Sequence, residues 1–418
     1  MPPSLRQRIG YESAPGFLIR SAPKPMGIQP ISRRCHYLLA IVFLALAALA
    51  MRPAVGQSTG AVPADLAGAV EQYRRALDAY NAAHDRYAAV ANAYWSAVTE
   101  KRKARNAKRA AGEALTIDDY VLDQPPVYTG PPKPKNPLKP EGPEHRAPVP
   151  LVSDFVAAAQ KQFGFVPRFP QSDLQFKQVY AQVAQAAGLT KDQVVRIYSF
   201  EATGNGSYDV EAGLEYNKHG RAITTALGYN QLLATNSVEI LAEKGPQFID
   251  AFRTEASRLT GVERRALESK IDVLRKMVAF ARSVPDEWGQ HETLAGTEKG
   301  LAVHALNLDI DVGPLLQTQK LLDSVVFARR KGVTRTLTAA ELEMMNLTGD
   351  GNGFDMVTMP HEWRERVPTA NFFRPSGYFD NPVAQRNNVV AKLIAATDAR
   401  MDEETKKQGA RDLAAALR

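Results

Sequence analysis

The residue best placed for chemistry in this 418-residue sequence is Glu201. It ends an apolar, helix-like segment, VVRIYSFE (194–201), and the helix-breaking run ATGNG follows directly. A carboxylate at that position faces the negative end of the helix dipole and apolar neighbours such as Phe200, and both favour its protonated form. A carboxylic acid that keeps its proton near neutral pH can act as a general acid. The alternative is a solvated glutamate at a helix end.

A second segment downstream strengthens the catalytic interpretation. The run GYNQL (228–232) is followed by Thr235, about 30 residues after Glu201. Together the two segments resemble the lysozyme-like bacterial lytic transglycosylases, in which a catalytic Glu ends a helix, a Gly-x-x-Gln motif with an apolar residue follows, and a Thr then opens the next helix. Such enzymes often have Ser directly after the Glu, where this chain has Ala202. That departure puts in doubt the substrate contact which the Ser usually makes.

The resemblance implies a fold, a substrate and a reaction. The fold would be a mainly α, lysozyme-like domain, and the substrate would be the glycan strands of peptidoglycan. The reaction would be cleavage of the β-1,4 bond between N-acetylmuramic acid and N-acetylglucosamine, with Glu201 acting in turn as acid and base while the muramyl C6 hydroxyl closes a 1,6-anhydro ring. A hydrolytic muramidase would want a second carboxylate, and Asp209, Glu211 and Glu215 lie close enough in the sequence to supply one.

Five other residues are predicted to contact the substrate. Thr203 stands one step past the usual Ser position, and Tyr229, Asn230 and Gln231 belong to the second motif. Aromatic faces stack on sugars, and amides can bond N-acetyl groups. Tyr378 is added because transglycosylases of this fold commonly place a late tyrosine near the acid. For Tyr229, packing in the core is an equal alternative.

The elements that must position these residues are helices. From 151 to 418, apolar residues recur at helical spacing between short polar breaks, and long alternating strands are absent, so we expect one mainly α domain. The segment DGNGFD (350–355) lacks the ligand register and closing Glu of a calcium loop and is interpreted as a turn. We expect no metal and no cofactor. The expected helices are 152–163, 172–187, 191–201, 234–244, 246–260, 262–283, 297–306, 311–330, 338–346 and 384–415.

A heptad pattern occupies the segment 61–113. Apolar residues recur in steps of four and three from Leu66 to Val98, with tyrosine at every seventh position from Tyr73 to Tyr94. Such a seam predicts one long helix, with 66–98 binding a coiled-coil partner or a second copy. The alternative is that the tyrosine stripe packs on its own chain. The helix ends in KRKARNAKR (101–109), interpreted as a solvated helix end or as a contact with anionic lipid of the inner membrane or with acidic polymer.

The remaining segments suggest export and a spacer. Residues 1–56 combine Arg33-Arg34 with a run of 15 apolar residues (37–51) and small residues at a cleavage position. This pattern predicts a signal peptide. The alternative is an N-terminal anchor. The protein would then be exported and periplasmic or envelope-associated. Residues 114–150 contain ten prolines in their last 27 positions and predict an extended linker.

The net charge of +7 is concentrated at the N-terminus. The leader holds seven basic residues and one acidic residue, whereas 151–418 holds 32 basic and 33 acidic residues. The expected catalytic domain therefore has no electrostatic footprint for nucleic acid. Two functions remain open at this point: a lytic transglycosylase, and a non-catalytic envelope scaffold that binds glycan and recruits a partner through the heptad helix.

Overall fold

The computed structural model describes residues 64–139, 148–212 and 222–417. The leader 1–56, with its predicted signal peptide, and Glu215 lie outside these residues. The described residues fall into two compact units: the larger includes 84–129, 148–212 and 222–417, and the smaller includes 64–83 and 130–139. Within the described part, no helix combines the length and the apolar character needed to cross a bilayer.

The described residues are mainly helical, as the sequence predicts, and their β-structure is limited to three isolated bridges. Short 3-10 turns η1 (Ile117–Asp119), η2 (Ala305–Leu308) and η3 (Thr369–Phe372) interrupt the α-helices. The helices are α1 (Ala64–Ala111), α2 (Val152–Phe163), α3 (Asp173–Ala186), α4 (Lys191–Glu201), α5 (Ala234–Ala256), α6 (Gly261–Ala281), α7 (Trp288–Ala295), α8 (Glu298–His304), α9 (Gly313–Arg330), α10 (Ala339–Thr348), α11 (Asp350–Thr358), α12 (His361–Arg364), α13 (Pro375–Phe379), α14 (Pro382–Arg386), α15 (Val390–Glu404) and α16 (Gln408–Ala416).

Two of the differences from the expected helices concern Pro246 and the segment 350–355. The predicted break at Pro246 is wrong, because α5 runs through it as one helix. The segment 350–355 is helical rather than a turn and begins α11. Gly349 supplies the sharp bend with a φ of 82°, and a Cβ on Gly353 would lie 2.3 Å from the Cα atom of Met345. The glycines therefore serve close packing of α11 on α10, and tertiary contact overrides their low helix propensity.

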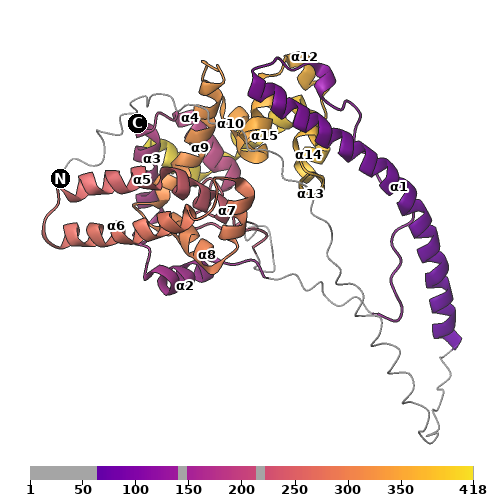
Figure 1. The fold of residues 1–418 in the computed structure, drawn as a ribbon, viewed down its shortest axis with the longest axis horizontal. Coiled ribbons are helices and arrows are strands. Elements are labelled where there is room, and N and C mark those ends of the chain that lie inside the picture. The colour runs from indigo at the N-terminus through magenta and orange to yellow at the C-terminus, as the bar shows by residue number, and fades with distance from the viewer. Residues whose placement is uncertain (1–63, 140–147, 213–221, 418) are drawn as a thin grey trace, which may run out of the picture. The chain divides into compact units, whose positions relative to one another are not determined.

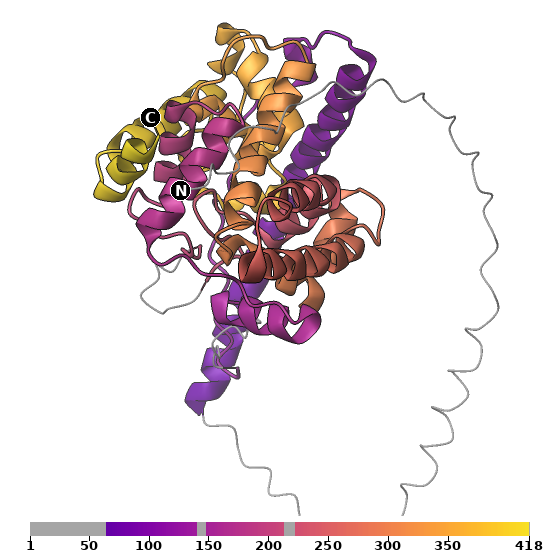
Figure 2. The same ribbon diagram turned by 90° about the vertical axis from the view of Figure 1, so that its left-hand side faces the viewer.

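The larger unit contains two hydrophobic clusters that meet along α9. One cluster gathers apolar residues of α3, α4, α10, α15 and α16, and the other gathers those of α2 and α5 to α8. Helices α5 and α6 lie side by side (Figure 1), and the C-terminal helices α15 and α16 (yellow) lie beside α3 and α4 (Figure 2). Since Leu316 of α9 belongs to one cluster and Leu321 to the other, α9 positions the residues between them.

The C-terminal half of α1 packs on its own chain. The ring of Tyr87 lies 5.4 Å from that of Tyr128, and the ring of Trp95 lies 5.7 Å from that of Tyr378. Val98 is buried. The predicted coiled coil over the whole of 66–98 is therefore wrong for the half that follows His84, because residues of the same chain already cover that part of the seam.

The basic run at the end of α1 is turned inward. Arg105 is 0 % exposed, Arg102 donates to the carbonyl oxygen of Asn371, and Lys108 bonds both carboxylate oxygens of Asp119. The prediction of a solvated helix end is wrong for these residues. These residues make hydrogen bonds and ion pairs inside the larger unit instead.

The predicted linker 114–150 is only partly a spacer. Its first part packs into the larger unit: Tyr120 is buried, and the backbone N–H of Val121 donates to Asn371 Oδ1 at 2.9 Å. Asn371 Nδ2 donates back to the Val121 carbonyl at 2.8 Å. The boundary between helix, linker and domain therefore does not fall at 114, because residues up to Thr129 belong to the same compact unit as the C-terminal helices.

Candidate functional site

Glu201 is the last residue of α4, as the sequence predicts. The helix starts at a capping box in which the backbone N–H of Gln193 donates to Thr190 Oγ1 and the backbone N–H of Thr190 donates to Gln193 Oε1. It ends because Thr203 (φ 55°) and Gly204 (φ 69°) take left-handed backbone conformations. A Cβ on Gly204 would lie 2.3 Å from the carbonyl oxygen of Glu404, so only glycine lets this turn pack against the end of α15.

The side chain of Glu201 meets two residues of α10. Asn346 Nδ2 donates to Glu201 Oε1 at 2.9 Å and lies 3.4 Å from Glu343 Oε2. Glu343 is 0 % exposed and shares a hydrogen bond with Glu201. Apart from that bond, Glu343 Oε1 is buried without a hydrogen-bonding partner. Two carboxyl groups at hydrogen-bond distance need a proton between them, so this pair binds protons as a unit.

Burial sets the proton affinity of the pair. It raises the pKa of Glu201 to about 7, against the opposing effects of the hydrogen bonds from Glu343 and Asn346 and of the charge of Lys320. Burial, and then the negative charge of Glu201, raise the pKa of Glu343 well above its usual value. Glu343 therefore keeps its proton and donates it to Glu201, and the Glu201 carboxyl gains or loses its own proton near neutral pH.

The positive charge of Lys320 on α9 acts on this pair. Its charge lowers the pKa values of Glu201 and Glu343, and also those of Glu239 on α5 and Asp350 on α11, which burial raises. Carboxyl groups from α4, α5, α10 and α11 thus share one lysine. A site with more buried carboxyl groups than cations holds protons at neutral pH, which is the condition for acid catalysis by Glu201.

The second carboxylate was expected elsewhere. Asp209 accepts a hydrogen bond from Ser207 Oγ, Glu211 accepts one from the backbone N–H of Val152, and Glu215 lies outside the described residues. Glu343 is the carboxyl that meets Glu201. The sequence does contain a signal for Glu343. Thr338 and Glu341 form a capping box, so helix capping explains the presence of Glu341. Glu343 has no such explanation and is an acid inside the apolar run LEMM.

The second motif forms a tight turn whose residues face inward. Gln231 takes a left-handed conformation (φ 44°), and its Nε2 donates to the carbonyl oxygens of Val210 and Gly228. Asn230 is 1 % exposed and donates to Tyr180 Oη at 2.8 Å. The prediction that Asn230 lines a saccharide groove is therefore wrong, and the amide of Gln231 holds its own loop.

Both tyrosines predicted to contact substrate lie in the core. Tyr229 is 0 % exposed; its hydroxyl donates to Asp173 Oδ1 at 2.8 Å, and its ring lies 4.6 Å from that of Tyr198 on α4. Tyr378 is 4 % exposed and packs against Trp95. The groove prediction is wrong for both, because side chains without exposed surface cannot stack on a sugar. Thr203 adjoins Glu201 but is only 9 % exposed, and its backbone forms the turn after α4.

A buried polar network fixes the second motif. Gln317 of α9 accepts from the backbone N–H of Asn230 at 2.7 Å and donates to the Leu227 carbonyl at 3.1 Å. It also donates to Asn307 Oδ1 at 2.9 Å, and Asn307 in turn donates to Ser237 Oγ at 2.8 Å. The role of Asn230 is therefore to tie the turn to α9.

Replacing Gln317 with leucine is expected to destabilise the fold by about 3 kcal/mol, because several buried polar groups would lose their partner. Urea denaturation measures the loss. The control is Gln290→Leu on α7, where the side chain is exposed and the expected change is below about 0.5 kcal/mol. Equal small losses in both variants would contradict the network's assigned role.

The comparisons with known proteins add no relative to this site. No protein-family model, no curated protein and no solved structure matches the chain.

Proposed function

We propose that this protein cleaves the β-1,4 bond between N-acetylmuramic acid and N-acetylglucosamine in peptidoglycan, as a lytic transglycosylase with a lysozyme-like domain and Glu201 as its acid/base. The observation that carries the proposal is the carboxyl pair at the end of α4, in which burial raises the pKa of Glu201 to about 7. At neutral pH, a carboxyl group with that pKa is present in both its protonated and its ionised form. A group that first donates and then accepts a proton needs both forms.

In the proposed reaction the Glu201 carboxyl donates its proton to the glycosidic oxygen as the bond from that oxygen to the muramyl C1 breaks. The resulting carboxylate takes the proton of the C6 hydroxyl, whose oxygen bonds to C1 and closes the 1,6-anhydro ring. Glu201 ends the cycle protonated. Glu343 has no exposed surface, so it is a hydrogen-bonding partner of Glu201 rather than a nucleophile. Asn346 holds Glu201 Oε1 in place.

The test is incubation of the purified protein with isolated peptidoglycan sacculi, followed by mass spectrometry of the soluble products. The proposal expects release of muropeptides that end in 1,6-anhydromuramic acid. Products with reducing ends would show that the protein is a hydrolase, which uses water, and not a lytic transglycosylase. Absence of any release at pH 5 to 8 would overturn the enzymatic proposal.

A second candidate function is supported by the burial of three predicted contact residues. Tyr229, Asn230 and Tyr378 lie in the core, and the carboxyl of Glu201 is already bonded to α10. A non-catalytic envelope scaffold would have this arrangement as well, with glycan bound by other residues. It predicts that the protein co-sediments with sacculi and releases nothing. Export to the periplasm or envelope belongs to both proposals.

A further inference from the structure

A buried cluster of charged side chains in the larger unit joins the end of α1 to α11. Arg109 Nε donates to Asp355 Oδ1 at 3.1 Å, and Arg109 Nη2 donates to Asp355 Oδ2 at 2.5 Å. Arg105 Nε lies 3.4 Å from the same Oδ2 atom. Asp355 is 2 % exposed. These groups are about 250 residues apart in the sequence, so the cluster joins two distant segments of the chain.

This cluster is costly to bury. Burial lowers the pKa of Arg105 and raises the pKa of Asp355, although each charge favours ionisation of the other. Desolvation thus exceeds the mutual attraction on both sides, so the pair is weak support for stability. Such a pair does fix the geometry of the elements that it joins. Separating the partners would leave an uncompensated buried charge, which is strongly destabilising.

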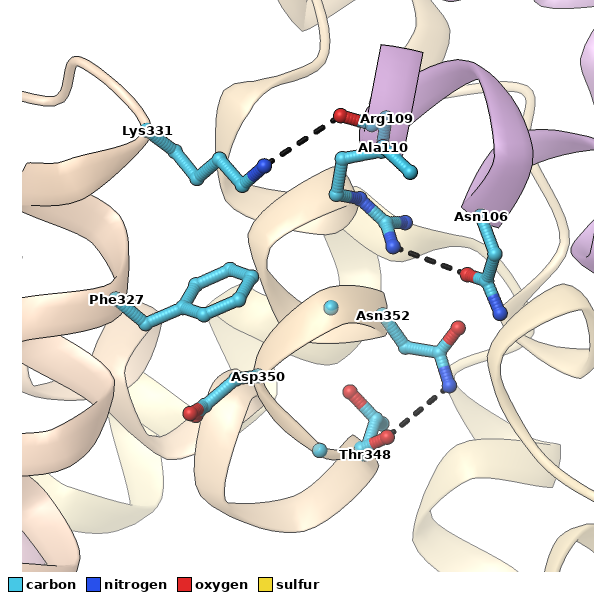
Figure 3. Close-up of a pocket in the computed structure, with 10 residues that line it drawn as sticks. Asn106, Arg109, Ala110, Phe327, Lys331, Thr348, Asp350 and Asn352 are labelled. Carbon is cyan, nitrogen blue, oxygen red and sulfur yellow. Dashed lines mark hydrogen bonds between the residues drawn. The ribbon is translucent and has the colours of Figure 1, made fainter. Parts of the chain in front are cut away.

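The geometry that it fixes is the junction between α10 and α11. Figure 3 shows Arg109 above this junction, at a pocket of about 420 Å³ that is also lined by Phe327, Lys331 and residues 348–352. A Cβ on Gly351 would lie 2.8 Å from Arg109 Nη1, so the guanidinium rests directly on the first turn of α11. Lys331 Nζ donates to the Arg109 carbonyl at 3.4 Å and ties α9 to the same place.

The junction is stiff on the side that leads to Glu201. Gly353 of α11 packs on the backbone of Met345, with no room for a Cβ. Met345 lies between Glu343 and Asn346 in α10, and those two residues contact the Glu201 carboxyl. A displacement of α11 would therefore be transmitted through one turn of α10 to the carboxyl pair.

We propose that the C-terminal half of α1 is a positioning element of the candidate site: Arg105 and Arg109 hold Asp355, and through α11 and α10 they fix Glu343 and Asn346 against Glu201. Asp355, Arg105 and Arg109 are positioning residues, since none of them touches Glu201 directly. The charged groups that face the carboxyl pair are Lys320 on α9 and, around that lysine, Glu239 on α5 and Asp350 on α11. This inference extends the proposed function. Only its predicted effect on catalysis rests on that function.

The experiment compares two buried ion pairs in the full chain. Asp355→Asn weakens the α1–α11 contact. The matched control is Asp309→Asn, which removes a 0 % exposed carboxylate that bonds Lys270 Nζ at 2.8 Å through both oxygens and lies outside the α10–α11 junction. The readout is the titration midpoint of the Glu201 carboxyl, followed by ¹³C NMR of carboxyl-labelled glutamate and assigned with Glu201→Gln.

Asp355→Asn is expected to lower the Glu201 midpoint by at least one pH unit, because a loosened α10 admits water to the carboxyl pair. Asp309→Asn is expected to destabilise the fold without moving the midpoint. If Asp355→Asn does not fold, Arg109→Gln replaces it, since Arg109 is the more exposed arginine and should shift the midpoint in the same direction. An unchanged midpoint in the α1–α11 variant, or equal shifts in that variant and the control, overturns the proposal. The titration needs no activity, so its outcome is separate from that of the sacculus assay.

Discussion

Replacing Glu201 with glutamine is expected to reduce cleavage of peptidoglycan by about three orders of magnitude or more. The amide is nearly isosteric and can still accept from Asn346, so the fold should persist, but it can neither give a proton to the glycosidic oxygen nor take one from the C6 hydroxyl. The measurement is the initial rate of muropeptide release from sacculi at pH 6 to 7.

The control for this variant is Glu211→Gln. Glu211 was a candidate second carboxylate, and its carboxylate accepts from the backbone N–H of Val152 instead of meeting Glu201. Its loss should change the rate by less than about tenfold, the effect expected of a group outside the reaction. A Glu201→Gln variant with wild-type activity would remove Glu201 from the mechanism. Equal losses in both variants would point to a folding defect.

Replacing Glu343 with glutamine is expected to stabilise the protein at neutral and alkaline pH. The folded-state pKa of Glu343 lies well above its ordinary value of 4.5, so above pH 4.5 the folded state holds a proton that the unfolded state has released. Stability then falls by about 1.4 kcal/mol per pH unit as the pH rises through this window. An amide needs no such proton, so the gain should be near zero at pH 4 and should grow as the pH rises above 4.5.

Urea denaturation of wild type and Glu343→Gln at pH 4, 5.5 and 7 tests this dependence. The glutamine amide can donate to Glu201 as the protonated Glu343 carboxyl does, so cleavage activity should stay within about tenfold of wild type. The matched control is Glu343→Leu, which lacks a donor for Glu201 and should impair activity as well. A constant difference in stability between wild type and Glu343→Gln across the three pH values would contradict the protonated state assigned to Glu343.

Much of the fold follows from local sequence patterns. Helices α2 and α4 begin and end where apolar spacing and breakers predict, and Glu201 ends α4 because Thr203 and Gly204 turn the chain. The interior of α11 could not be predicted, since its glycines and asparagine favour a turn. Only the packing of Gly353 on Met345 and the contact between Asp355 and Arg109 favour a helix there.

The partners of Glu201 were harder to predict than Glu201 itself. Glu343 follows Glu201 by 142 positions, and nothing local indicates that α10 packs on the end of α4. The motif residues Tyr229 and Asn230 are chemically suited to sugar binding, yet their environment decides otherwise: one packs on Tyr198 and the other bonds Gln317. Residue type predicts what a side chain can do, whereas long-range packing decides whether a ligand can reach it.

The basic run of α1 shows the same limitation. Nine residues with six positive charges favour a solvated end or an anionic surface when only local sequence is considered. The structure instead directs Arg105 and Arg109 to Asp355, which lies about 250 residues later in the chain. Nothing in the sequence around Asp355 identifies these arginines as its partners.

Glu201 exchanges a proton near neutral pH because burial raises the pKa of its carboxyl group. The most direct test is the ¹³C NMR titration of the Glu201 carboxyl in the wild-type protein. We expect a midpoint near pH 7. A midpoint near 4.5, the ordinary value for glutamate, would leave Glu201 without the proton that the proposed reaction needs and would contradict its role as the acid.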